Sequence, residues 1–170
     1  MKNERKAQTA FYNRYLSTLN NTALRYAASK QDAKDILQKS FVKIFKSLDQ
    51  LQKPEDHLIN WMKRVTINTA INHKRTSDNY NKHVDLSTFY LLQEECHSNK
   101  IEDEQLVYAL KKLKPIYYEI VSLIAIDGYS HKEAGALLGI EEGSSRGRYS
   151  RAIKAIRSHI NHPTDKITHG

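Results

Sequence analysis

The chain has 170 residues and a formal net charge of +8, so it is long enough for one domain or two small ones and favours a polyanionic partner. Its single cysteine, Cys96, excludes an internal disulfide and fits a reducing cytoplasm. The basic, polar start argues against a signal peptide. The longest nearly apolar run, residues 120–126, is far shorter than the roughly 20 residues of a membrane span. We therefore expect a cytoplasmic protein with no membrane insertion.

The distribution of helix breakers and charges predicts an all-α chain of two small helical domains joined by a linker. Only three Pro and six Gly occur, and no alternating apolar run suggests a strand. Residues 1–75 carry 15 basic and 6 acidic side chains, residues 76–104 carry 2 and 7, and residues 105–170 carry 10 and 6. Two basic segments around an acidic one suggest two lobes that touch nucleic acid. The expected divisions are a first domain at 1–75, an acidic linker at 76–104, a second domain at 105–162 and a tail at 163–170.

The first two predicted helices span residues 5–28 and 31–48. Apolar residues at steps of three and four make the first an ordinary core helix, and the second is strongly amphipathic. Its inward face holds Leu37, Phe41, Ile44, Phe45 and Leu48. Another side gathers Asp35, Gln38, Lys39 and Val42. An exposed valine beside an acid and an amide suggests a protein-docking surface, although exposed polar residues usually mean only solvation.

A polar segment follows, and then a second basic helix is predicted. Residues 49–58 contain Pro54 and are expected to form a loop, after which Asp56 or Asn60 would cap the next helix. Residues 58–75 carry apolar residues at helical spacing and four basic residues without an acid after residue 60. This segment is therefore predicted as a basic amphipathic helix.

One face of this helix gathers side chains suited to DNA. Arg64, Asn68, Asn72 and Arg75 lie at steps of three and four residues and so share a face. Arg and Asn are donors that suit phosphates and base edges. Trp61, near the helix start, could stack on an unpaired base, which is worth about 1–3 kcal/mol per base. It could equally be a core anchor, and the residues leave both interpretations open.

The second lobe is predicted to begin after residues 76–104, which lack clear periodicity and are the best linker candidate. Residues 101–113 space three leucines for a helix. Pro115 suits the first turn of the next helix. Its apolar residues recur at helical spacing, and Asp127-Gly128 would end it. Those apolar residues are Ile116, Ile120, Leu123 and Ile124.

A short helix and a sharp turn come next. Ser130 is a good N-cap, and Glu133 three residues later completes a capping box. The short helix has one apolar side, made of Ala134, Leu137 and Leu138. Gly139 ends it, and Glu141 and Glu142 place acids where the dipole of the following helix favours them.

The final predicted helix is basic on one side and apolar on another. The apolar stripe consists of Tyr149, Ala152, Ile153, Ile156 and Ile160. Ser144, Arg148 and Arg151 form a different stripe, flanked by Arg146 and Lys154. A short helix, a glycine turn and a basic second helix is the helix-turn-helix pattern, whose second helix enters the major groove of DNA. A solvated basic face on an ordinary helical hairpin is the alternative, but the capping box, the turn and the arginine face together favour DNA binding.

The chain resembles the small extracytoplasmic-function (ECF) branch of the sigma-70 family of bacterial RNA polymerase sigma factors, over residues 11–75 and 104–160. The family's polymerase-binding helix has an acid, a glutamine three residues later and a following phenylalanine, which Asp35, Gln38 and Phe41 match. Its promoter-melting helix begins with a tryptophan and has an Arg-x-x-x-Asn step and a basic end. The matching residues are Trp61, Arg64, Asn68 and Arg75, with Asn72 where the family often has Asp.

The family's C-terminal helix-turn-helix is similar to residues 113–148, with two departures. Ser145 replaces an apolar residue that would lie four before Tyr149 on the inward stripe. Gly147 is a poor residue for a helix interior, at a cost of about 1 kcal/mol relative to alanine, and it could let the backbone approach DNA closely. The departures leave the fold prediction intact.

The resemblance implies a sigma factor that binds core RNA polymerase and promoter DNA. The first lobe would bind polymerase through Asp35, Gln38 and Phe41 and open the −10 element, with the loop at residues 49–60 capturing a flipped base. The −10 contacts would be Trp61, Arg64, Asn68, Asn72 and Arg75, and the −35 contacts Ser144, Arg146, Arg148 and Arg151. Sigma factors of this kind are commonly held inactive by an anti-sigma factor, so such a partner is also implied, and no cofactor is.

Two other classes of function compete with this interpretation. A helix-turn-helix regulator that binds an operator without polymerase fits the second lobe equally well, but it has no need of the helix with Asp35, Gln38 and Phe41. An enzyme is disfavoured, because the eight His show no metal-ligand pattern with Cys or carboxylates. No glycine-rich phosphate loop, nucleophile elbow or paired-carboxylate site occurs either.

Overall fold

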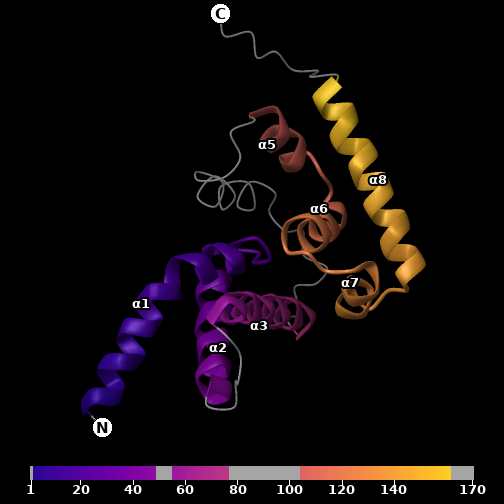
Figure 1. Cartoon of the computed structure of the whole chain (residues 1–170). Coiled ribbons are helices and arrows are strands. Elements are labelled where there is room, and N and C mark those ends of the chain that lie inside the picture. Colours follow the sequence, from indigo (N-terminus) through magenta and orange to yellow (C-terminus); the bar gives the residue numbers. More distant parts are fainter. Residues whose placement is uncertain (1, 49–54, 77–103, 162–170) are drawn as a thin grey trace, which may run out of the picture. The chain divides into compact units, whose positions relative to one another are not determined.

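The computed structural model describes residues 2–48, 55–76 and 104–161 of the chain. It divides into two compact units, residues 1–96 (unit 1) and residues 97–170 (unit 2). Within the described ranges every regular element is a helix, as Figure 1 shows, and the predicted all-α fold is confirmed. Most of the predicted linker, residues 77–103, lies outside these ranges. None of the described helices is long and apolar enough to cross a membrane.

The described part of unit 1 consists of three helices, each of which packs on the other two (Figure 1). They are α1 (Lys2–Leu24), α2 (Lys30–Leu48) and α3 (Glu55–Thr76). Their apolar stripes meet in one core cluster of buried residues, Leu19, Leu37, Phe41, Ile44 and Met62. The inward face predicted for residues 31–48 is confirmed, because Leu37, Phe41 and Ile44 are buried and Phe45 packs against the cluster. Burial of such side chains stabilises a fold by roughly 1.5–3 kcal/mol each.

Aromatic rings join the middle of α1 to the second half of α2. The ring centroids of Phe11 and Phe45 are 5.6 Å apart, and those of Tyr12 and Phe41 are 4.5 Å apart. Tilted aromatic pairs at these separations add about 0.5–1.5 kcal/mol to the burial of their area. In contrast, α1 buries no side chain between Arg5 and Ala10. The contact between α1 and the other two helices is therefore made by its later turns.

The first two helix boundaries differ slightly from the prediction. Helix α1 ends at Leu24 and not at residue 28. Ser29 then caps the next helix, which starts at Lys30. Its hydroxyl accepts a hydrogen bond from the backbone N–H of Asp32 at 3.0 Å, and its carbonyl accepts one from Ala33 at 3.0 Å. A serine cap of this kind fixes the start of α2. Tyr26 and Ala27 remain buried although they lie outside the helix.

The predicted start of α3 is wrong. The helix begins at Glu55, so residues 55–58 are helical and not part of a loop, and neither Asp56 nor Asn60 can be its N-cap. The sequence offers a reason, because Pro54 comes directly before two acids, Glu55 and Asp56, which the positive end of the helix dipole favours in a first turn. The remaining residues of the predicted loop, 49–54, lie outside the described ranges.

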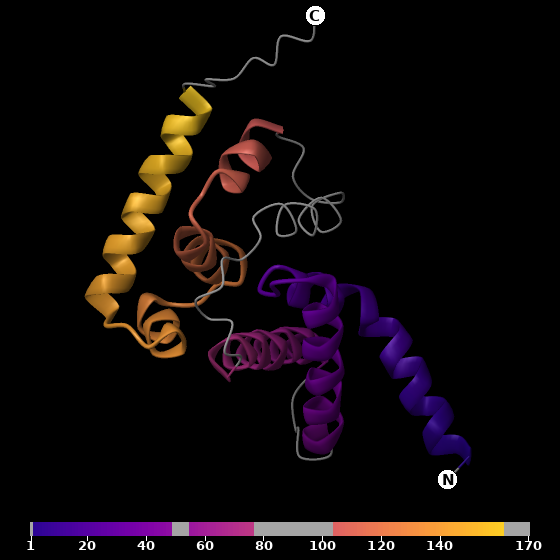
Figure 2. The same ribbon diagram turned by 180° about the vertical axis from the view of Figure 1, so that it is seen from behind.

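In unit 2 a long last helix packs along three shorter ones, as Figure 2 shows from behind. The short helices are α5 (Glu104–Lys111), α6 (Pro115–Val121) and α7 (His131–Leu138), and the long one is α8 (Glu142–Asn161). Pro115 is in the first turn of α6, as predicted. Helix α8 buries Ala152 and Ile156 of its predicted apolar stripe and half-buries Tyr149, Ile153 and Ile160.

A π-helix, η2 (Ser122–Ile126), continues α6 up to the stop predicted at Asp127-Gly128. The N–H of Asp127 donates to the carbonyl of Ser122 at 2.9 Å, five residues back, so the turn contains one residue more than an α-turn. The inward stripe predicted for this segment is only partly right. Ile120 and Leu123 are buried, but Ile116 is 41% exposed and Tyr118 is buried in its place.

The predicted start of α7 and its turn into α8 are confirmed in detail. Ser130 and Glu133 form a full capping box, in which the Ser130 hydroxyl accepts from the Glu133 N–H and the Glu133 carboxylate accepts from the Ser130 N–H. Gly139 ends α7 with φ +67°, in the left-handed region that glycine adopts without strain. The same turn requires the glycine at position 135, because a Cβ there would lie 2.7 Å from the carbonyl oxygen of Ile140.

The close approach at Gly135 predicts that Gly135→Ala lowers the free energy of unfolding of unit 2 by about 1–3 kcal/mol, the range for an overpacked interior. Amide hydrogen exchange of α7 and α8 in the full chain would measure it, since it reports each unit separately. Gly143→Ala is the matched control, because no atom lies within 4 Å of a Cβ at that position. Equal exchange rates in both variants would contradict the prediction.

Candidate nucleic-acid interface

Helix α3 presents a continuous polar face to solvent. Arg64, Asn68, Asn72 and Arg75 are all exposed, so the structure brings the four predicted residues together on one side of the helix. The opposite side buries Met62 and Ala70, and Ile67 and Ile71 are buried along the border of the polar face. Two guanidinium groups and two amides along about three turns offer donors to phosphates and to base edges alike.

Trp61 lies at the edge of this face and is half-buried. It packs against the core cluster of unit 1, next to Leu58, Ile59 and Val65. The core-anchor interpretation therefore holds for one part of the ring, while the rest stays open to solvent. An aromatic residue in this position can anchor the helix and still offer a surface for stacking.

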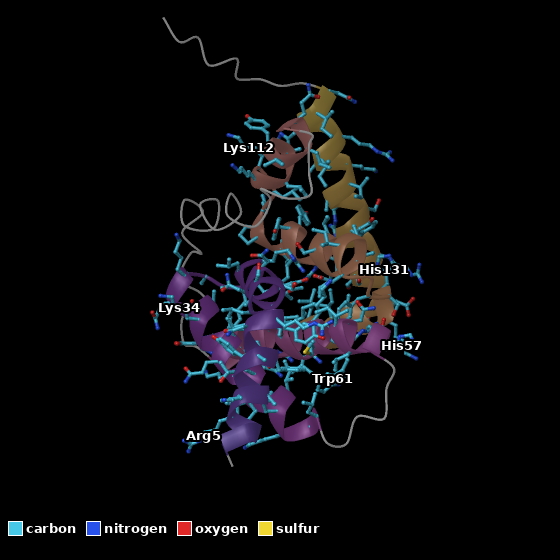
Figure 3. All side chains as sticks on the ribbon, turned by 60° about the vertical axis from the view of Figure 1, so that its left-hand side comes forward. Arg5, Lys34, His57, Trp61, Lys112 and His131 are labelled. Atoms are coloured by element: carbon cyan, nitrogen blue, oxygen red, sulfur yellow. The ribbon has the colours of Figure 1, made fainter. Side chains whose placement is uncertain are left out.

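Two further exposed residues lie on the same face and were missed by the sequence-based prediction. His57 and Asn60 both belong to the first turns of α3, whereas the sequence pattern predicts a loop at His57 and offers Asn60 only as an N-cap. His57 precedes Arg64 by seven residues, or two turns, so both lie on one line of the helix. Figure 3 shows His57 at the start of α3, one turn before Trp61. Recognising Glu55 and Asp56 as a first helical turn would have revealed them.

Polar contacts fasten α3 to α2. The Lys43 ammonium donates to the Thr69 hydroxyl at 3.0 Å, and the Lys39 ammonium lies 3.0 Å from Nδ1 of His73. Nε2 of His73 faces the Asp32 carboxylate at 3.6 Å. With Lys39 donating to Nδ1, the proton of a neutral imidazole is on Nε2 and faces Asp32. These contacts fix the C-terminal half of α3, which bears Asn68, Asn72 and Arg75.

The solvent side of α2 matches the predicted docking surface in part. Gln38 and Lys39 are exposed, Asp35 is half-exposed, and Val42 is 50% exposed, which is a large fraction for a valine. The Gln31 amide donates to the Asp35 carboxylate at 3.2 Å and orients it. We call Gln31, Asp35, Gln38 and Val42 the α2 surface.

Phe41 differs from its two predicted partners, because it is only 3% exposed and belongs to the core cluster. It cannot contribute contact area to a partner. Tyr12 of α1 covers it with a ring centroid separation of 4.5 Å and is itself 36% exposed. The exposed aromatic ring beside α2 is thus that of Tyr12. Because Tyr12 belongs to α1, the residue pattern within α2 could not have predicted it.

The four residues predicted on α8 divide into two groups. Ser144, Arg148 and Arg151 lie on one side of the buried stripe, and Arg146 lies on the other, since residues two apart on an α-helix point in nearly opposite directions. The Arg146 guanidinium pairs with the Glu142 carboxylate one turn earlier. Arg151 donates from Nε to the carbonyl of Gly147 at 3.1 Å. Ser144, Arg146 and Arg151 are exposed, and Arg148 is half-buried.

Ser145, the residue that departs from an apolar inward stripe, is fully buried at 0% exposure. Its hydroxyl is 3.0 Å from Nδ1 of His131, the first residue of α7. The His131 ring also meets the Tyr149 ring edge to face, with centroids 5.5 Å apart. Figure 3 labels His131 at the start of α7. A polar pair across the turn therefore replaces the expected apolar contact and satisfies the buried hydroxyl.

The described residues contain no group of three or more His, Cys, Asp or Glu placed to hold a metal ion. What the two units offer instead is a set of donors on the faces of α3 and α8. These surfaces can bind a polyanion and orient it, and their amides and guanidinium groups can distinguish base edges.

Comparison with known proteins gives consistent matches. The family model described as sigma-70 region 2 matches residues 11–80, and that described as sigma-70 region 4 matches residues 103–156. The chain is 30% identical over 128 residues to the RNA polymerase sigma factor CarQ of Myxococcus xanthus, covering 74% of this chain and 72% of that protein. It is 26% identical over 151 residues to the ECF RNA polymerase sigma factor SigE of Mycolicibacterium smegmatis, covering 81% of this chain and 55%, about half, of that protein.

Among solved structures, the sigma factor RpoE, crystallised with the anti-sigma factor NepR from Bartonella quintana, is similar with a TM-score of 0.54. The match covers 92% of this chain and 98% of that one at 17% sequence identity. At this identity the likeness concerns the fold.

The contact between His131 and Ser145 predicts an energetic coupling across the turn. A double-mutant cycle of His131→Ala and Ser145→Ala is expected to give about 0.5–1.5 kcal/mol of coupling in the stability of unit 2, the net value of one hydrogen bond. Amide exchange of α8 measures it. Lys132→Ala, an exposed neighbour of His131, combined with Ser145→Ala should be additive. A coupling near zero for the His131 pair would mean that the bond does not contribute.

Proposed function

The chain belongs to the ECF branch of the sigma-70 family, whose members bind core RNA polymerase and direct promoter-specific initiation, and we propose that it performs this function through the α2 surface, the exposed face of α3 and the helix-turn-helix of α7 and α8. The observation that carries the proposal is that the α2 surface and the exposed face of α3 are adjacent. The α2 surface and the exposed polar face of α3 lie on neighbouring helices of one unit, which are joined by the contacts of Lys43 and Lys39. A regulator that acts without polymerase has no need of that pairing.

The α2 surface is the proposed polymerase contact. Val42 supplies apolar area, Gln38 supplies an amide, and Asp35 supplies a carboxylate oriented by Gln31. An apolar centre with a polar rim is the usual anatomy of a protein interface. Phe41 supports this surface from beneath, through its packing with Tyr12, and is not itself a contact.

The face of α3 is the proposed contact for the −10 element. Arg64 and Arg75 would hold the DNA backbone, whose phosphates dominate affinity. Asn68 and Asn72, between them on the same face, would read base edges. The exposed part of Trp61 would stack on an unpaired base. We propose residues 49–60 as the segment that captures a flipped base. Its residues 55–60 are the first turns of α3, and they carry the exposed His57 and Asn60.

Helices α7 and α8 are proposed to bind the −35 element as duplex. The capping box fixes the start of α7, Gly139 fixes its end, and α8 then presents Ser144, Arg146, Arg148 and Arg151 on its outer turns. In this motif the N-terminal residues of the second helix contact base edges in the major groove. The pair of Arg146 with Glu142 would have to open, or the carboxylate would have to accept from a base.

The whole-chain organisation follows from these roles. We propose residues 1–75 as the polymerase-binding and promoter-melting domain, residues 76–104 as an acidic linker, residues 105–162 as the −35 domain and residues 163–170 as a tail. The chain would act in the cytoplasm, with polymerase and chromosome, and would catalyse no reaction and hold no cofactor. An anti-sigma factor is a further proposed partner, as in the Bartonella relative that was crystallised with one.

Transcription from genomic DNA tests the function. Core polymerase with the purified chain should initiate at a defined set of fragments, and the shared sequences upstream of their start sites would identify the two elements. If the chain binds DNA sites but neither binds core polymerase nor directs initiation, it is an operator-binding regulator and the proposal fails.

Asp35→Ala is expected to weaken binding of the chain to core polymerase by about 1–2 kcal/mol, as for an interface residue near an apolar centre. Competition against labelled wild-type chain measures the affinity. Ser17→Ala, an exposed position on α1, is the control and should bind as wild type. If Asp35→Ala also changed the thermal midpoint of unit 1, misfolding would explain the loss and the docking role would be withdrawn.

Arg148→Ala is expected to weaken holoenzyme binding to a promoter by about 1–3 kcal/mol if Arg148 reads a base. The loss should disappear on a duplex whose −35 element is scrambled. Arg157→Ala removes the same charge two to three turns further along α8 and should weaken both duplexes equally or not at all. Titration at one fixed salt concentration gives both values, and unchanged binding of Arg148→Ala would remove this residue from the interface.

A further inference from the structure

Unit 2 places two glycines inside its helix-turn-helix helices, and only one of them is required by the fold. At Gly135 a Cβ would lie 2.7 Å from the carbonyl oxygen of Ile140, so the turn between α7 and α8 needs the glycine. At Gly147 a Cβ would meet only NH2 of Arg151, at 3.6 Å, which is ordinary van der Waals contact. An interior glycine destabilises a helix, and nothing within the described part of unit 2 compensates for that at position 147.

Gly147 lies at the middle of the solvent side of α8. The buried residues Ser145, Ala152 and Ile156 lie on the opposite side of the helix. Neighbouring residues of an α-helix are about 100° apart, so Arg146 and Arg148 flank Gly147 on its two sides. Gly147 is half-buried, and it leaves one position on this side of the helix without a side chain, between two guanidinium-bearing residues.

Arg151 completes this arrangement. It lies one turn after Gly147 and donates from Nε to the Gly147 carbonyl at 3.1 Å, so its guanidinium is held beside the glycine. The region from residue 143 to residue 160 contains five Lys and Arg and no acid. A backbone position without a side chain, surrounded by arginines, allows a polyanion to come closer to the helix than any side chain there would allow.

Resting on the proposed binding of duplex DNA by α8, we infer that Gly147 is the point of closest approach between the helix and the duplex. The main chain, and not a side chain, meets the DNA at this position. Arg146, Arg148 and Arg151 surround the contact and hold the sugar-phosphate backbone or groove edge against it. Gly147 is then a specificity-determining residue, because the depth to which α8 enters the groove decides which bases its arginines reach.

Substitutions at Gly147 distinguish an effect on folding from an effect on DNA contact, because stability and DNA affinity are expected to change in opposite directions. Gly147→Ala and Gly147→Gln should leave the thermal midpoint of the full chain unchanged or raise it, because both residues are better helix formers than glycine. The same variants, reconstituted with core polymerase, should lose affinity for a promoter duplex at least fivefold and at least twentyfold respectively. Ser158→Gln adds the same bulk at an exposed position three turns further along α8 and should bind as wild type.

Each other outcome overturns the inference. Binding within twofold of wild type for both variants means that no duplex approaches Gly147. Lost binding together with a lowered thermal midpoint means that the fold requires the glycine. Equal losses in Ser158→Gln mean that bulk anywhere on α8 is harmful. If the wild-type holoenzyme itself binds no promoter duplex, the proposed function fails, which is a result distinct from all three.

Discussion

The close approach of the end of α7 to the start of α8 is the constraint on which the DNA-binding unit depends. The carbonyl oxygen of Ile140 lies 2.7 Å from the place that a Cβ of Gly135 would take, and the N–H of Ile140 donates to the carbonyl of Gly135 at 2.9 Å. Gly139 supplies the left-handed backbone that lets the chain turn there. With the turn fixed, the buried pair of His131 and Ser145 has one geometry, and the solvent face of α8 is aimed in one direction.

In unit 1, side-chain contacts and not a backbone turn fix the arrangement of the helices. Its three helices share an apolar core, and the exposed edge between α2 and α3 is joined by Lys43 with Thr69 and by Lys39 with His73. Hydrogen bonds at such exposed positions contribute little stability each. Their consequence is geometric, because they orient the exposed polar face of α3 relative to the α2 surface. The proposed polymerase and promoter contacts are thereby coupled within a single rigid set of helices.

Polar residues have a different function in each setting. Ser145 is buried and bonded, so its role is internal to unit 2. Arg151 is exposed and donates to the Gly147 carbonyl of its own helix, which holds its guanidinium beside the glycine. Ordering a long side chain in advance reduces the entropy lost on binding. The pair of Arg146 with Glu142 has the opposite consequence, since it would have to open before Arg146 met DNA.

The sequence by itself determined the all-α fold, the face shared by Arg64, Asn68, Asn72 and Arg75, and the capping box and glycine end of α7, because local spacing and short-range hydrogen bonds decide these features. It could not place Tyr12 or Ile116, whose exposure depends on which neighbouring helix covers them. It placed Phe41 on the inward face of its helix, and the burial of this side chain separates it from the exposed Gln38 and Val42. It flagged Ser145 and Gly147 as departures without explaining them. Only the tertiary structure decided that His131 from another helix satisfies Ser145, while Gly147 meets nothing but a side chain of its own helix.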